Sequence, residues 1–511
     1  MSGNRTIAKN TLLLYFRMMI TMVIQLYTSR VILQVLGVND YGIYQAVGGI
    51  VGFLSLLNGV LSTGSSRFLT FALGEGDKEK LKRVFSTTLT GHICLALIVV
   101  IIAETGGLWF LYHKMNIPPE RMDAALVVFH LSIVTSFFSL TQVPYNASII
   151  AHEKMGVYAY VSIFEAVARL AIVYILLVGK IDRLILYAIL LCLLQVGIII
   201  FYRFYCVRHF EETHFKLYID KKLFKEIAGF SGWSLFANSS IALNSQGVLI
   251  LLNMFFSSAV VAARSISLQV NSVANQFVSN FQTAANPQIV KLYAAKDYEG
   301  SKRLLLQTTK YSYFLMLLLA LPIFLTADSL LTIWLGVVPE YTVVFLQLVI
   351  IQSLFQVFDT SFYRALYAKG RLKENALISP IIGFLQFPIV YFLFKIGCSP
   401  IALSWASLLG CVLVGVVVKP LLVIKIVDYS WKDIISVFVP CIKVTLLSLP
   451  LPVIAYFCLN EYLPTTGVVK FIFLVLVSVF SVGVVTWFWG LDRLTREKLL
   501  LIVKTKLYKK E

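Results

Sequence analysis

Apolar stretches of about 20 to 30 residues recur along the whole chain, separated by short polar segments. Each is long enough to cross a bilayer as an α-helix, which pairs all of its backbone polar groups internally. Only 14% of the residues are charged, well below the roughly 25% of a typical soluble protein. The sequence therefore predicts an all-α polytopic membrane protein.

The apolar stretches predict about fourteen spanning helices, from the lengths that they cover. The expected spans are 10–36, 41–71, 84–112, 123–151, 157–178, 183–205, 227–252, 257–292, 304–335, 341–366, 376–396, 399–424, 437–458 and 466–489. If the N-terminus is cytoplasmic and loops alternate sides, the cytoplasmic loops hold most of the 44 Lys and Arg residues. The net charge of +18 is then mainly a sign of orientation, with both termini cytoplasmic, and nucleic-acid binding is not expected.

An internal repeat divides the chain. The loop GEGDKEKLKR at 74–83 returns 220 residues later as AAKDYEGSKR at 294–303, with Asp77 aligned to Asp297. Six helices separate the two copies, and an even number gives both the same orientation in the membrane. We therefore expect two six-helix lobes related by a parallel repeat, followed by an appended helix pair. The predicted parts are an N-terminal lobe at 1–205, a cytoplasmic linker at 206–226, a C-terminal lobe at 227–424, the appended pair at 425–489 and a cytoplasmic amphipathic tail at 490–511.

A stripe of polar side chains follows one face of the span at 257–292. At 100° per residue its members lie within about 60° of one another: Arg264, Asn271, Asn275, Gln282 and Asn286. An ionisable residue inside a membrane helix indicates function, so this face is predicted to line a polar cavity. The alternative is that the stripe only packs against a neighbouring helix.

Basic and amide side chains on the first, second, seventh and eighth spans are candidates for the same cavity. Arginine presents a fixed fork of donors that fits phosphate oxygens, and amides suit sugar hydroxyls. On the first span, Arg17 and Arg30 lie about 140° apart, so a straight helix presents one of them to the cavity and both stay candidates. The residues predict phosphate contacts at Arg264 and at Arg17 or Arg30, whereas Arg67 either guards the cytoplasmic mouth of the cavity or marks the membrane surface. The predicted sugar contacts are Gln25, Asn58, Asn238, Asn271, Asn275 and Gln282.

Other chemistry-bearing residues are interpreted structurally. Glu165 and Arg169 have the i,i+4 spacing of an intrahelical ion pair, and Asp359 and Arg364 are expected to pair within another helix. The 7 cysteines are dispersed without paired spacings, which indicates neither a metal site nor a disulfide.

The segment from Asn10 to Asp77, which begins NTLLLYFRMMITMVIQLYTSR, resembles bacterial polysaccharide transporters, the O-antigen and capsule repeat-unit flippases. Their superfamily, MOP, also contains the lipid II flippase and the MATE drug exporters. The resemblance implies a flippase of the bacterial inner membrane, without enzymatic activity, that moves polyprenyl-diphosphate-linked oligosaccharides to the periplasmic leaflet by alternating access. It further implies that arginines of the first, second and eighth helices hold the diphosphate, which in this sequence are Arg17 or Arg30, Arg67 and Arg264.

The same resemblance implies the protein's partners. They are the lipid-linked oligosaccharide, membrane lipid, and the polysaccharide polymerase with its chain-length machinery. A sodium or proton gradient is the implied energy source, and no cofactor is expected.

Two other functions are weighed against this one. A MATE-type exporter of cationic drugs is expected to carry acidic residues in its cavity, whereas the first span carries arginine and no acid. A membrane glycan polymerase or transferase needs a catalytic loop outside the membrane. The longest outward loop, at 113–123, is short and has no acidic pair at a useful spacing.

Overall fold

The protein is helical throughout the part of the chain that the computed structural model describes. This part comprises residues 2–54, 65, 68–69, 72–73, 75–152, 154, 156–178, 181–214, 218–226, 239–240, 242–370, 373–462, 467–493 and 495–497. The side chains in these ranges are described except those of 2–18, 53–54, 159, 283–284, 287, 294, 373–377, 379, 460 and 462. Within these ranges, ten helices are long and apolar enough to cross a membrane, and two shorter helices are also apolar. The predicted all-α polytopic fold is confirmed.

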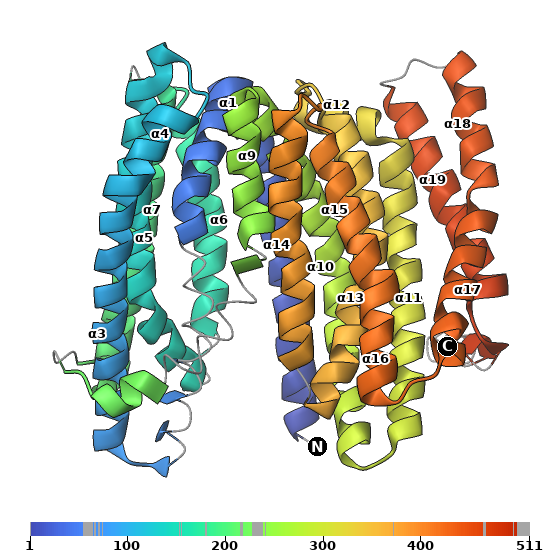
Figure 1. Ribbon diagram of the computed structural model, residues 1–511, viewed down its shortest axis with the longest axis horizontal. Coiled ribbons are helices and arrows are strands. Elements are labelled where there is room, and N and C mark those ends of the chain that lie inside the picture. The colour runs from blue at the N-terminus through green and yellow to red at the C-terminus, as the bar shows by residue number, and fades with distance from the viewer. Residues whose placement is uncertain are drawn as a thin grey trace, which may run out of the picture. The chain divides into compact units, whose positions relative to one another are not determined.

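The chain packs as two compact units, and the long helices of each run side by side (Figure 1). The first unit holds residues 1–265 and 383–397. Its elements are α1 (Ser2–Leu54), α3 (Lys78–Ile102), η1 (Ala103–Gly107), α4 (Leu108–Lys114), η2 (Pro119–Arg121), α5 (Met122–Ala151), α6 (Gly156–Ile175), α7 (Arg183–His209), η3 (Glu211–Thr213), η4 (Leu243–Gly247), α9 (Val248–Phe255) and the start of α10 (Ser258–Ala294).

Two predicted spans are joined in α1. The backbone at Gly37 has a φ of 79°, which L side chains rarely adopt, and the chain turns there. The turn lies between the predicted spans 10–36 and 41–71, so glycine separates two membrane helices without an extended loop.

The second unit holds residues 266–382 and 398–511. Its elements are the rest of α10, α11 (Tyr298–Leu325), α12 (Ala327–Leu335), α13 (Thr342–Lys369), the start of α14 (Lys373–Lys395), α15 (Ala402–Val412), η5 (Leu413–Val418), α16 (Lys419–Val427), α17 (Trp431–Ser448), α18 (Pro450–Tyr462), α19 (Val468–Val485) and η6 (Thr486–Gly490). The appended helices α17 and α19 both pack against α11, where Tyr313 and Thr445 share a hydrogen bond of 2.9 Å between hydroxyls.

The repeated loop has the same backbone conformation in both copies. Asp77 caps α3 by accepting from the backbone N–H of Lys80 at 2.9 Å, and Asp297 caps α11 by accepting from that of Gly300 at 2.9 Å. The residue before each aspartate has a positive φ, 74° at Gly76 and 65° at Lys296. The two copies of the loop, one in each unit, therefore share the cap and the backbone turn.

The compact units do not divide at the predicted linker. The first unit also contains η4, α9, the first turns of α10 and the second half of α14. The packing of α1 against α9 and η4 explains this division. The boundary that separates the units along α10 therefore falls after Ser265.

Candidate functional site

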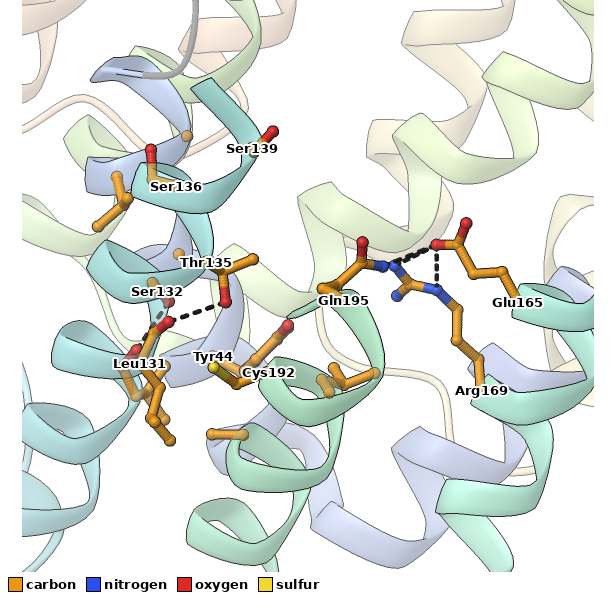
Figure 2. Close-up of a pocket in the computed structure, with 16 residues that line it drawn as sticks. Tyr44, Leu131, Ser132, Thr135, Ser136, Ser139, Glu165, Arg169, Cys192 and Gln195 are labelled. Atoms are coloured by element: carbon orange, nitrogen blue, oxygen red, sulfur yellow. Dashed lines mark hydrogen bonds and ion pairs between the residues drawn. The ribbon is translucent and has the colours of Figure 1, made fainter. Parts of the chain in front are cut away.

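A cavity of about 400 Å³ lies inside the first unit, lined by α1, α5, α6 and α7 (Figure 2). This volume is within the range of about 300–1,000 Å³ that small-molecule sites occupy. All four helices belong to predicted or observed membrane spans. Polar and charged side chains at such a position are costly in a membrane and therefore mark a candidate functional site.

One wall of this cavity carries a charged pair. Arg169 donates from Nε and Nη2 to Oε1 of Glu165, at 3.0 and 2.8 Å, and Gln195 donates from Nε2 to the same oxygen at 2.8 Å. Glu165 and Arg169 are one turn apart on α6, and the ion pair predicted from their spacing is confirmed. Gln195 comes from α7 and links the pair to the next helix, a contact that no sequence pattern indicated.

The opposite wall is a row of hydroxyls on α5 (Figure 2). Ser132 and Thr135 donate to carbonyl oxygens one turn earlier on their own helix, at 2.7 and 2.9 Å. Ser136 and Ser139 continue the row along α5. A hydroxyl whose proton bonds its own helix still has lone pairs with which to accept a hydrogen bond. This wall can therefore accept hydrogen bonds from a ligand.

An ion-pair network joins three segments at the end of the first unit where α1 turns. Arg121 of η2 donates to Asp40 from Nε at 2.9 Å and from Nη2 at 2.5 Å, and to Asp182 from Nη1 at 2.5 Å. Asp182 also caps α7 by accepting from the backbone N–H of Leu184 at 3.0 Å. The hydrogen bond from Arg121 lowers the pKa of the Asp182 carboxyl below its ordinary value. No sequence pattern indicates this network, because its members lie far apart along the chain.

Replacing Arg121 with glutamine should lower the thermal stability of the protein in detergent. Each charged hydrogen bond lost contributes about 1.5–3 kcal/mol to the free energy of unfolding. Because Arg121 lowers the pKa of Asp182, the part of this stabilisation that comes from Asp182 is present above the unfolded value of about 3.9 and is lost as the pH falls through the lower folded value. Thermal unfolding measured from pH 7 to pH 3 would test both effects.

A matched control for this prediction is Arg208→Gln, because Arg208 is an exposed arginine of the same unit that lies over the ring of Phe204. The control should unfold like the wild type. Equal stability of the Arg121 variant and the wild type at neutral pH would show that the network does not stabilise the unit.

Close backbone contacts bring the second half of α1 against α9 and the start of α10. A Cβ atom on Gly42 would lie 1.8 Å from the carbonyl oxygen of Ser258, so only glycine permits this approach. A Cβ on Gly52 would lie 3.5 Å from the side chain of Gln246 in η4. Asn253 of α9 accepts a hydrogen bond from the backbone N–H of Asn116 at 3.1 Å. These contacts fix the first unit around the helices that line its cavity.

The predicted diphosphate contacts are only partly described. Arg264 lies in the part of α10 that packs with the first unit, and its side chain is buried, with 3% of the residue exposed. Arg30 is half-buried on α1, and the predicted sugar contact Gln25 is exposed on the same helix. The other candidates in this half lie outside the described side chains: Arg17, Asn58, Arg67 and Asn238.

The rest of the polar stripe on α10 makes hydrogen bonds to α13 in the second unit. Asn275 donates from Nδ2 to Ser353 at 3.2 Å, and Ser353 donates to the side-chain oxygen of Asn271. Gln282 has 2% of its surface exposed and donates to Ser361 at 2.9 Å. These three amides therefore pack against a neighbouring helix, which is the alternative that the sequence left open.

The predicted ion pair between Asp359 and Arg364 is wrong. Asp359 accepts from Lys419 of α16, with 2.8 Å between Oδ1 and Nζ. Arg364 donates to the carbonyl oxygen and to Oε1 of Gln282, both at 3.3 Å. Five residues along a helix correspond to about 140° of rotation, so the two side chains of α13 point to different neighbours. Arg364 therefore bonds neutral groups in the described part of the chain, although it lies in a helix that can span a membrane.

Comparisons with known proteins agree with this architecture. No family model matches the chain. The uncharacterized membrane protein EpsK of Bacillus subtilis (strain 168) is 20% identical over 423 residues, which cover 81% of this chain and 82% of EpsK. The lipid II flippase MurJ, in an inward closed conformation, has a TM-score of 0.71 at 13% identity, covering 93% of this chain and 98% of MurJ. A multidrug resistance MATE family transporter of the MOP superfamily, in an inward-facing conformation, has a TM-score of 0.67 at 16% identity. The match covers 81% of this chain and 98% of the transporter. The chain thus has the fold that these transporters share.

Proposed function

We propose that this protein moves polyprenyl-diphosphate-linked oligosaccharides from the cytoplasmic to the periplasmic leaflet of a bacterial inner membrane, by alternating access. The exported units supply the synthesis of surface polysaccharide such as O-antigen or capsule, where a polymerase and its chain-length machinery take them up. A sodium or proton gradient drives the cycle, and both termini lie in the cytoplasm. The protein itself carries out no covalent chemistry.

The observation that supports this proposal most is a buried arginine in a long helix of a fold that resembles that of a lipid II flippase. Arg264 is 3% exposed in α10, and the fold resembles that of a lipid II flippase over 93% of the chain. Burying a charged side chain away from water is costly, so a buried arginine is kept where it has a role. A guanidinium fits two phosphate oxygens at once. The proposed diphosphate contacts are Arg264, Arg67 and one of Arg17 and Arg30.

Export of a cationic drug is the competing function that the same fold would allow. A cation site needs a carboxylate whose charge is available to the ligand. In the cavity of the first unit, the carboxylate of Glu165 is already paired with Arg169, with 2.8 Å between Oε1 and Nη2. This pairing favours the lipid-linked cargo over a cation.

Binding to the purified protein in detergent would test the proposed function. Native mass spectrometry would compare a polyprenyl diphosphate oligosaccharide with the corresponding polyprenyl monophosphate, with a lipophilic cationic dye as competitor. We expect at least about tenfold tighter binding of the diphosphate, because a second phosphate accepts further charge-assisted hydrogen bonds. Preferential binding of the dye, without discrimination between the two lipids, would assign the protein to the cation exporters instead.

A further inference from the structure

We propose that the cavity of the first unit is the subsite that holds the sugar part of the cargo. This inference rests on the proposed function and assigns the sugar to the space between α1, α5, α6 and α7. The amide stripe of α10 was the expected sugar site. Its members Asn271, Asn275 and Gln282 already form hydrogen bonds with serines of α13. The cavity, in contrast, has groups that no described residue engages.

The charged wall of the cavity has unused donors and acceptors. Arg169 and Gln195 donate three hydrogen bonds to a single oxygen, Oε1 of Glu165. Within the described residues, Oε2 of Glu165, Nη1 of Arg169 and Oε1 of Gln195 are therefore left for a ligand. The ion pair of Glu165 and Arg169 holds these groups in place, so the site is preorganised before the ligand arrives.

The hydroxyl wall adds acceptors, and α1 adds a donor. Ser132 and Thr135 have given their protons to their own helix and present lone pairs. The ring of Tyr44, which also lines the cavity, packs edge-on against Tyr187 with 5.0 Å between centroids. Its hydroxyl can donate or accept. A sugar ring carries many hydroxyls, each both donor and acceptor, and matches this mixture.

The charge of the cavity favours a neutral ligand. Glu165 and Arg169 form the charged pair of the lining, and their charges cancel. A phosphate would meet the carboxylate, and a metal cation would meet the guanidinium, at close range. Apolar lining residues, such as Val128 and Leu131 of α5, offer surface to the C–H faces of a sugar. A neutral polyhydroxyl group satisfies the polar and the apolar parts of this lining together.

The test compares two lipids on the full-length protein in detergent. The probes are polyprenyl diphosphate linked to N-acetylglucosamine and the bare polyprenyl diphosphate. The variants are the double substitution Ser132→Ala with Thr135→Val, and Tyr44→Phe, which removes only a hydroxyl. Thr105→Val is the matched control, because Thr105 donates to a carbonyl oxygen one turn earlier at 2.7 Å but lies outside the cavity lining.

We expect the wild type and the control to bind the glycosylated lipid at least about tenfold more tightly than the bare lipid, and each variant to lose most of this preference. Unchanged affinity for the bare lipid would show that the variants are folded. A preference that survives in both variants, or is absent from the wild type, would overturn the sugar subsite and leave the flippase proposal standing. Failure of the wild type to bind either lipid would reject the flippase proposal itself. Sodium binding that the variants lose, measured without lipid, would make the cavity an ion site and overturn the inference.

Discussion

Replacing Arg264 with alanine should abolish surface polysaccharide in cells that depend on this protein, while the protein remains inserted at its normal level. In the proposed function, Arg264 contributes two charge-assisted hydrogen bonds to the diphosphate, each of about 1.5–3 kcal/mol. Loss of both should weaken binding of the lipid by about 100-fold or more. Polysaccharide on intact cells and the protein in the membrane fraction would be measured together.

Two further variants separate a binding role of Arg264 from a structural one. Arg264→Lys keeps the charge but not the fork of donors, so it should restore part of the export. Arg303→Ala removes an exposed arginine at the start of α11 and should have no effect. Normal polysaccharide in the alanine variant would remove Arg264 from the site. Loss of the protein from the membrane in both Arg264 variants would make its role structural.

Hydropathy located the helices well because a bilayer accepts only segments that bond internally. The predicted span 123–151 corresponds to α5 (Met122–Ala151), and 183–205 to the first part of α7 (Arg183–His209). The repeated loop was also predictable, because an aspartate that caps a helix is a local signal. The division of the chain after Ser265 could not be predicted. It depends on how closely Gly42 lets two helices approach, which is a property of the packed pair and not of either helix alone.

In the candidate site, too, contacts within one helix could be predicted and contacts between helices could not. The pair of Glu165 and Arg169 was predictable because one helical turn brings the two side chains together. The contact of Gln195 with that pair comes from a neighbouring helix, as does the contact of Asp359 with Lys419. Partners on different helices depend on rotation and register, which a helical wheel does not contain. The cavity, to which four helices contribute, could not be predicted for the same reason.

Removing one member of the pair of Lys419 and Asp359 should be among the most destabilising single changes in the second unit. The side chain of Lys419 is 3% exposed, and its Nζ lies 2.8 Å from Oδ1 of Asp359 and 5.4 Å from the ring centroid of Tyr363. Asp359→Ala would remove the carboxylate of Asp359 from a buried ammonium group, which costs about 3–5 kcal/mol. Thermal unfolding of the detergent-purified variant would show the loss as a lower midpoint.

The double variant Asp359→Ala with Lys419→Met distinguishes this explanation from a loss of packing. Replacing both partners of a buried ion pair by apolar groups is often neutral or stabilising. Here the cost of desolvating the buried ammonium group disappears as well, whereas the Asp359 side chain is 33% exposed. We therefore expect the double variant to unfold within about 1 kcal/mol of the wild type, and above the single variant. A double variant no more stable than Asp359→Ala would mean that the ammonium group is not the source of the loss. The carboxylate would then act through its own packing on α13, and the two residues would be energetically independent although they are in contact.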